Sequence, residues 1–260
     1  MRFHPIAVFA ALTMAGAAAM PAAASGDGDA APKTIAFRAE AKVTLDVAGH
    51  PQAIEPSEDL PAPVREFIRQ RVAQWRFSPP AQGGVTGPAV TYLRLGACAI
   101  PQADGTYRMA VDFKGNGPLY ANGPMMLPPA YPKSALIREI GAQAKVTFVV
   151  GTDGRATIEG IEYADRSNHR ADGIDAALRD WVRGMRYEPE QLAGHPVRTR
   201  STVPVVFSIA GKDFTRDKFR EQLREKSAKS QECRLAAGEA APEGLQAVAL
   251  DSPVRIDPAG

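Results

Sequence analysis

Residues 128–209 of this 260-residue chain contain, in order, the stretches PPAYP (128–132), AKVTFVV (144–150), TDGR (152–155), IDAALRDWVRGMRYEP (174–189) and VPVVF (203–207). The AKVTFVV stretch alternates polar with apolar side chains, which is the period of a half-buried strand. Gly154 can adopt the positive φ of a tight hairpin, so segments 144–151 and 155–163 are expected to pair antiparallel. The order predicts two paired strands, a helix and a closing strand.

The helical stretch carries apolar side chains at spacings of three and four residues, which places them on one face. These side chains are Ile174, Ala177, Leu178, Trp181 and Met185. We expect this stripe to cover the apolar face of the sheet. The closing strand, 197–209, is expected to pair with the first strand, which then lies between the other two.

This order of elements resembles the C-terminal domain of TonB, the periplasmic energy transducer of Gram-negative envelopes. The resemblance implies an α+β fold, in which one helix packs on an antiparallel three-stranded sheet. It also implies that the domain binds proteins and does no chemistry, since in TonB it engages the TonB box, a short extended segment of outer-membrane transporters. Carried over by position, the candidate partner-binding residues are Tyr131, Pro132, Val203, Pro204, Val205, Val206 and Phe207.

Pro204 indicates that the closing strand lies at a sheet edge. A proline has no N–H to donate to a strand ladder, so it is found mainly at strand starts, bulges and edges. An exposed edge is a template on which another chain can add a strand. The alternative is an edge covered by the other half of the chain or by a C-terminal helix. The sequence leaves both arrangements open.

The first half of the chain repeats parts of this plan. VTLDV (43–47) corresponds to VTFVV (146–150) with an offset of 103, and WRFSP (75–79) corresponds to MRYEP (185–189) with an offset of 110. A glycine precedes the closing strand in both halves, at Gly84 and Gly194. The matches predict a tandem duplication. Its first copy is degenerate, because it lacks the Tyr-Pro opening and the Asp-Gly turn.

The predicted fold class is therefore α+β, with two small units that each pack one helix on an antiparallel sheet of three or slightly more strands. In the first unit we expect a strand at 34–47, a helix at 61–75 and a hairpin of strands 89–100 and 107–113. The predicted domains are 1–25 signal peptide, 33–114 degenerate unit, 115–127 linker, 128–210 TonB C-terminal-like unit, 211–235 charged helix and 236–260 flexible tail.

The N-terminus has the pattern of a secretory signal peptide. Arg2 precedes an uncharged run at 6–20, and PAAAS (21–25) offers a cleavage site. The run is 15 residues long, so a helix of it spans only ~22 Å of a ~30 Å hydrocarbon core. We expect cleavage and a periplasmic protein; the alternative is an uncleaved anchor in the inner membrane.

Cys98 and Cys233 are the two cysteines of the chain, and in an exported protein such a pair is expected to form a disulfide. The alternative is two unrelated buried thiols. A bond would close a loop of about 135 residues and pin the C-terminal region to the first half of the chain.

No catalytic, metal-binding or cofactor-binding pattern occurs in the sequence. The histidines, His4, His50, His169 and His195, stand apart from one another, and no zinc-protease, serine-hydrolase or phosphate-loop motif is present. The net charge of +2 argues against nucleic acid as a partner. We therefore expect a non-enzymatic protein whose partner is an envelope protein, such as a TonB-dependent outer-membrane transporter. The alternative is a structural envelope or cell-wall module.

Overall fold

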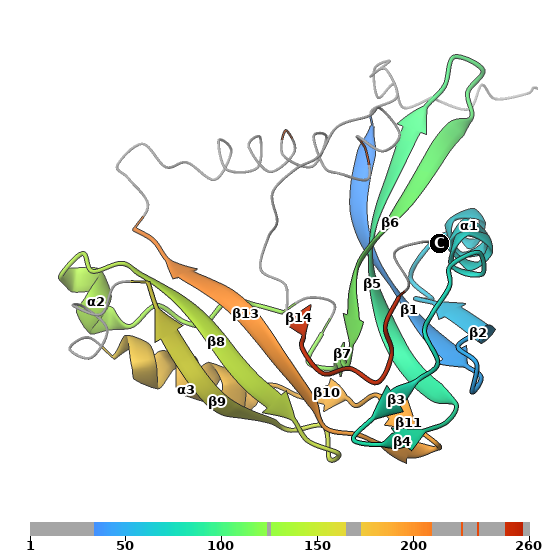
Figure 1. The fold of residues 1–260 in the computed structure, drawn as a ribbon. Helices are drawn as coiled ribbons and strands as arrows, with labels where there is room; N and C mark the ends of the chain where they lie inside the picture. The colour runs from blue at the N-terminus through green and yellow to red at the C-terminus, as the bar shows by residue number, and fades with distance from the viewer. Residues whose placement is uncertain are drawn as a thin grey trace, which may run out of the picture. The chain divides into compact units, whose positions relative to one another are not determined.

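The structure, a computed structural model, describes residues 34–123, 126–164, 173–209, 225, 233 and 248–256 (Figure 1). The predicted signal peptide, nearly all of the predicted charged helix and most of the predicted tail lie outside these residues. The described residues from 34 onward belong to a single compact unit, which holds both predicted halves.

The second half contains the predicted three-stranded sheet with one helix. Its elements are β8 (Ala142–Val150), β9 (Ala156–Tyr163), α3 (Ile174–Gly184) and β13 (Thr199–Phe207). The strands lie in the order β13-β8-β9, and β8 is antiparallel to both neighbours (Figure 1). The predicted pairing, with the first strand in the centre, is confirmed.

The core of this half lies between the sheet and α3. Alternate side chains of β8 and β13 are buried, and α3 buries Ile174, Leu178 and Val182 beside Met185. Trp181 is only partly buried, and its Nε1 donates to the carbonyl of Leu127 at 2.7 Å. The predicted helical stripe is therefore confirmed in outline, with Val182 in place of Trp181 at its centre.

The first half orders its strands in the same way. Its elements are β1 (Ile35–Leu45), β2 (Pro51–Pro56), α1 (Ala62–Val72), β5 (Ala89–Pro101) and β6 (Tyr107–Gly117). The order β5-β1-β2 matches β13-β8-β9, and β6 pairs with the outer edge of β5 as the predicted hairpin. A duplication accounts for this shared order, and it stays a prediction.

The two halves also share a five-residue turn between their first two strands, at residues 46–50 and 151–155. In each turn the first amide donates to the fifth carbonyl, and the fourth amide donates to the first carbonyl. The fourth residues, Gly49 and Gly154, have φ of 86° and 74°. The turns are related by an offset of 105 (151 − 46), two more than the sequence alignment gave, and the first half keeps an Asp and a Gly in its turn.

The same two glycines mark a close approach of the backbone. A Cβ on Gly49 would collide with the carbonyl oxygen of Phe77, and a Cβ on Gly154 would collide with that of Tyr187. Phe77 and Tyr187 are the residues that the WRFSP and MRYEP alignment places in register. Each turn therefore packs on the segment that follows the helix of its own half.

Short strands connect the halves. β11 (Gln191–Leu192) pairs with the start of β5, and β10 (Tyr187–Glu188) pairs with β7 (Leu119–Tyr120). Each half also contains a short hairpin at an equivalent position in its sequence. In the first half β3 (Ala81–Gln82) pairs with β4 (Val85–Thr86). In the second half β11 pairs with β12 (His195–Pro196). The predicted linker thus contains the end of β6 and all of β7, and it is not a free spacer.

The C-terminal segment 248–256 is packed on the body of the protein, although we expected 236–260 to be a flexible tail. β14 (Val248–Ala249) pairs with β13, and Val254 is buried in the core of the first half. The amide nitrogens of Ser78 and Ala81 donate to carbonyls of the same segment, at 2.9 and 3.0 Å. These backbone bonds hold the irregular segment on the body of the protein.

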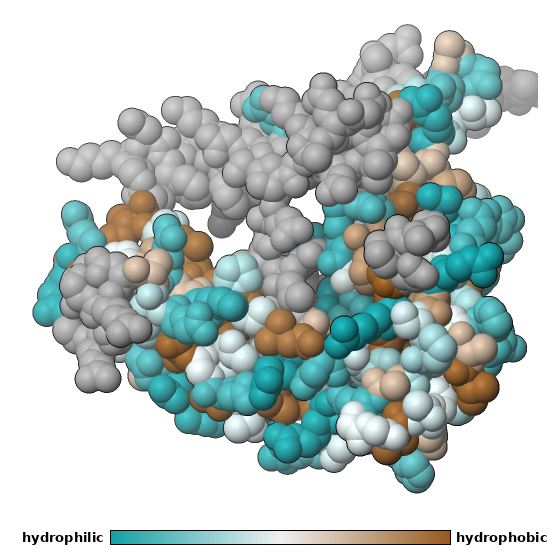
Figure 2. All heavy atoms as spheres, in the orientation of Figure 1, coloured by the Kyte–Doolittle hydropathy of each residue, from teal (hydrophilic) through white to brown (hydrophobic). Residues whose placement is uncertain are grey.

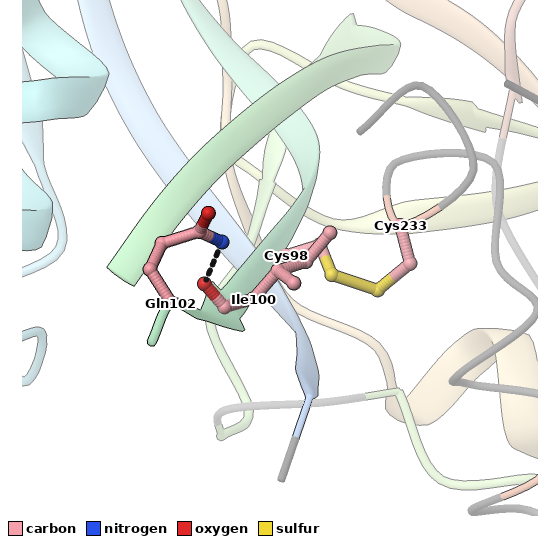
Figure 3. The surroundings of a disulfide bond; sticks show 4 residues. All are labelled: Cys98, Ile100, Gln102 and Cys233. Carbon is pink, nitrogen blue, oxygen red and sulfur yellow. Dashed lines mark hydrogen bonds between the residues drawn. A yellow bond between two sulfur atoms is a disulfide. The ribbon is translucent and has the colours of Figure 1, made fainter. Parts of the chain in front are cut away.

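The predicted disulfide is confirmed. Cys98, fully buried on β5, is bonded to Cys233, with a Cα–Cα distance of 5.1 Å (Figure 3). Beside it the Nε2 of Gln102 donates to the carbonyl of Ile100 at 3.1 Å, which closes the end of β5 (Figure 3). The bond ties the first half to a residue 135 positions away.

Candidate functional site

The candidate site is the outer edge of β13, the edge opposite β8. Both the N–H and the C=O of Arg200 point to this edge, because its carbonyl accepts from Leu250 N at 2.7 Å and its amide donates to Asp251 Oδ1 at 2.5 Å. Backbone groups of alternate residues face the same side of a strand. Thr202, Pro204 and Val206 therefore also present their backbones to the outer edge.

This arrangement explains how β13 accommodates a proline. Pro204 lies opposite Lys145 in an unbroken register with β8. Its missing N–H falls on the outer edge, so the ladder with β8 loses no donor. The outer edge beyond Thr202 consequently offers two carbonyl acceptors, of Pro204 and Val206, and one N–H donor, of Val206.

Side chains of β13 alternate between the core and the surface. Val203, Val205 and Phe207 are buried, with exposures of 0%, 1% and 5%. Pro204 is exposed, and Val206 is 58% exposed. Of the five β13 residues proposed from the sequence, only Pro204 and Val206 can touch a partner with their side chains; the other three hold the strand on the core.

The PPAYP stretch (128–132) supports the end of the same strand through Tyr131. The ring of Tyr131 stacks edge-on against Phe207 with centroids 5.3 Å apart, and its hydroxyl donates to the carbonyl of Ile140 at 2.7 Å. Pro132 caps α2 (Lys133–Ile137), and its carbonyl accepts from Leu136 N at 2.9 Å. The structure thus brings Tyr131 to the end of β13, where it supports the edge from within.

Exposed apolar side chains occur near the end of β13 and in α2. Figure 2 shows hydrophobic surface over the end of β13. Val206 and Ile209 are 58% and 38% exposed, and Leu136 and Ile137 of α2 are 51% and 81% exposed. An apolar border beside a partly unpaired strand edge suits a partner that adds a strand and places alternate side chains on the domain.

The edge is closed at its other end by the C-terminal segment. β14 pairs Ala249 with Ser201 and Val248 with Thr202. Within the described parts of the chain, no strand pairs with the outer edge at Pro204–Phe207. At Pro204–Phe207 no described strand covers the outer edge, as predicted. At Ser201 and Thr202 the edge is covered, but by strand β14 and not by the other half or a C-terminal helix, which were the alternatives.

A buried carboxyl lies where β13 begins. Glu190 is fully buried and accepts hydrogen bonds from the hydroxyls of Thr91, Thr199 and Ser252 at 2.5, 2.8 and 2.6 Å. Burial raises the pKa of Glu190, and the three hydroxyls and the nearby Arg94 guanidinium oppose that rise. Glu190 was not predicted as a site residue, because nothing in the sequence distinguishes it from a solvated surface glutamate.

A separate cavity of about 380 Å³ is lined mainly by residues of the first half, together with Leu119 of β7 and Glu188 of β10. Its lining carries both signs of charge, including Glu40, Lys42, Glu55 and Arg65, with Tyr92 among the other lining residues. Burial raises the pKa of Glu40, and burial also raises the pKa of Tyr92. None of the seven residues proposed for partner binding lines this cavity, so it is independent of the β13 edge.

Among the described residues, no group of three or more His, Cys, Asp or Glu side chains is placed to hold a metal ion. His50 lies in the first turn, with its Nδ1 3.3 Å from Asp46 Oδ2, where it supports the turn. No helix among the same residues has the length and apolar character to cross a membrane.

The second half is a small α+β domain of three antiparallel strands with one helix on one face. Residues 128–209 match the family model described as Gram-negative bacterial TonB protein C-terminal. Domains of this family are non-enzymatic modules that interact with envelope proteins.

Among solved structures the chain is similar to the solution NMR structure of the Pseudomonas aeruginosa TonB C-terminal domain. The two are 29% identical over 36% of this chain and 87% of that chain, with a TM-score of 0.26. No curated protein matches the chain.

Proposed function

We propose that the chain is a periplasmic TonB-like module that binds an extended segment of another envelope protein on the outer edge of β13. The observation that carries the proposal is the edge at Pro204 and Val206, where backbone acceptors and one donor face outward beside exposed apolar side chains. Strand addition supplies main-chain hydrogen bonds for affinity and alternate side-chain contacts for specificity. The N-terminal segments of TonB-dependent outer-membrane transporters are the partners we propose.

The periplasmic location is part of the proposal. The disulfide between Cys98 and Cys233 is of the kind that persists in oxidising compartments, and the N-terminal sequence has the pattern of a cleaved signal peptide. Binding at the β13 edge requires no energy coupling by this chain, so the proposal does not include force transmission.

The experiment is a calorimetric titration of the full mature chain with peptides from the N-termini of TonB-dependent transporters. We expect saturable binding by the wild type. Val206→Asp should abolish it, because the charge stands beside the donor and acceptors of the edge. Val205 is unsuitable for this test, since its side chain is 1% exposed and a charge there would disrupt the core.

The matched control is Val85→Asp on β4, where the native side chain is 53% exposed, close to the 58% of Val206. This variant should bind like the wild type, and circular dichroism should show all three proteins folded. Absence of binding at millimolar peptide would sink the proposal and favour the alternative, a structural module of the envelope. Equal weakening by both aspartates would show that net charge, and not the edge, decides binding.

A further inference from the structure

The chain's own C-terminal segment occupies part of the edge on which the proposed function depends. β14 runs antiparallel to β13 and covers it at Ser201 and Thr202. Two hydrogen bonds at Arg200 continue this pairing. The Leu250 amide donates to the Arg200 carbonyl, and the Arg200 amide donates to Asp251 Oδ1. Pro204, where the partner is proposed to bind, lies two residues beyond Thr202, so a partner strand that extends past Pro204 meets this occupant.

The occupying segment has one firmly held end. Ser252 donates to the buried Glu190 at 2.6 Å, and Asn116 Nδ2 donates to Ser252 Oγ and to the carbonyl of Val254 at 2.9 and 3.0 Å. The Val254 side chain is 1% exposed in the core of the first half. Release of this end would break a buried network of hydrogen bonds, and breaking it costs free energy.

Among the described residues, 248–251 are held by the pairing with β13 and by one side chain of β3, in which Gln82 Nε2 donates to the carbonyl of Asp251 at 2.7 Å. Leu250 is 48% exposed, and its amide makes a single backbone bond to Arg200. The described strand β14 is two residues long, Val248–Ala249. Ala249 packs closely over Gly117, where a Cβ would come within 2.9 Å of the Ala249 Cβ. Segments with few buried contacts open locally while the rest of the fold stays closed.

We infer that residues 248–251 form a built-in competitor strand, which peels from β13 while residues 252–256 remain anchored, and whose release lengthens the edge available to a partner. This inference rests on the proposed function, because it concerns the regulation of the same edge. The competitor and the partner present the same chemistry to β13, an extended backbone with its N–H and C=O groups in ladder register. Partner binding and β14 pairing at Thr202 are therefore mutually exclusive.

The test compares Leu250→Pro with Leu250→Ala in the full chain. Both variants remove the leucine side chain, but only the proline removes the N–H that donates to Arg200. Hydrogen exchange measured by NMR should be about tenfold faster at the Thr202 amide in the proline variant than in the alanine variant. The Val205 amide, which faces β8, should exchange equally slowly in both.

A second readout is the affinity for the transporter peptide. The proline variant should bind it several-fold more tightly than the alanine variant, because the competitor is weakened. Faster exchange at Thr202 with unchanged or weaker peptide binding would overturn the inference, since β14 would then be a structural strand. Unchanged exchange at Thr202 would overturn it as well. If the peptide binds neither variant nor the wild type, the proposed function fails, and the exchange measurement still decides whether residues 248–251 peel from β13.

Discussion

At the scale of single residues, the carboxyl group of Glu190 joins three segments of the chain. It accepts hydroxyl donors from β5, from the start of β13 and from Ser252 in the C-terminal segment. Removal of a buried acceptor leaves its donors without partners, which costs more than the hydrogen bonds themselves contribute. Glu190 is therefore a structural residue whose state affects how the beginning of the β13 edge is held.

We expect Glu190→Ala to lower the free energy of unfolding by about 3 kcal/mol, because three buried hydroxyls lose their acceptor and a cavity forms. Glu190→Gln should cost less, since the amide keeps an acceptor and can donate to a rotated hydroxyl. Urea denaturation of the three proteins at pH 7 measures both values. An alanine variant as stable as the glutamine variant would contradict this role.

The pH dependence follows from the direction of the pKa shift. Burial raises the pKa of Glu190 in the folded state, so the folded protein binds this proton more tightly than the unfolded chain does. The stabilisation is complete below the ordinary carboxyl pKa and is lost as the pH rises through the raised value. Relative to Glu190→Gln, the wild type should lose stability as the pH rises above the ordinary carboxyl pKa. A stability difference that stays constant as the pH rises would refute the raised pKa.

Gly154 gives a second prediction at this scale. It has a φ of 74°, and a Cβ there would collide with the carbonyl of Tyr187, so Gly154→Ala combines backbone strain with a clash. We expect a loss of about 2–4 kcal/mol in unfolding free energy. Gly194, with φ of 80° and open space around it, is the control, and Gly194→Ala should cost only about 1 kcal/mol. Equal losses would show that the close approach is unimportant.

The sequence predicted single residues well where a local rule governs them. The positive φ of Gly154 and the edge position of Pro204 follow from turn and ladder chemistry. The roles of Val203, Val205 and Phe207 were assigned by family position, and the structure places their side chains in the core. Glu190 was missed because its burial depends on Thr91 and Ser252, which are far away in sequence.

At the scale of elements, β13 combines an intact inner ladder with an outer edge that lacks one donor. The proline at position 204 weakens that outer edge without any cost to the pairing with β8. Proteins commonly blunt exposed edges in this way to prevent pairing between copies. The edge is thus open to a partner that brings its own donors and is less open to an identical β13 edge.

Pro204→Ala tests this reading of the edge. The alanine adds an N–H that faces outward, so we expect self-association to rise by several-fold while the unfolding free energy changes by less than about 1 kcal/mol. Sedimentation velocity over a concentration series measures the association. Pro196→Ala on β12 serves as the control and should stay at the wild-type oligomeric state. A loss of stability in Pro204→Ala with no added association would indicate that the proline supports the fold instead.

Long elements were predictable and short ones were not. The strands and helices with clear periodicity, including β8, β9 and α3, agree with the sequence prediction within a few residues. The two-residue strands β7, β10 and β14 have no periodic signal, because each exists only through a partner distant in the chain. The sequence therefore did not reveal that the edge has an occupant.

At the scale of the whole molecule, the described halves are connected by strand pairing, by core packing and by a disulfide, in addition to the backbone between them. β11 extends the sheet of the first half, the segment 252–256 packs in its core, and the disulfide fixes Cys233 to β5. These connections join into one compact unit what the sequence suggested were two domains and a tail. The isolated segment 128–209 would lack all three.

The disulfide provides a prediction at this scale. Loss of a crosslink across 135 residues should lower the unfolding free energy by about 4–5 kcal/mol in the chain-entropy model. Urea denaturation with and without a thiol reductant measures it. A variant with both Cys98→Ser and Cys233→Ser is the control, and the reductant should not change its stability. An equal response of the wild type and the control to the reductant would contradict the prediction.

Partner binding at the β13 edge is tested most directly by residue-resolved NMR of the full chain titrated with the N-terminal peptide of a TonB-dependent transporter. If β13 receives the partner on its outer edge, the amide of Val206 gains protection from hydrogen exchange and its resonance shifts most. The amide of Val205, which already pairs with β8, keeps its protection. Shifts centred on the charged cavity beside Tyr92, or no shift at millimolar peptide, would contradict binding at this edge.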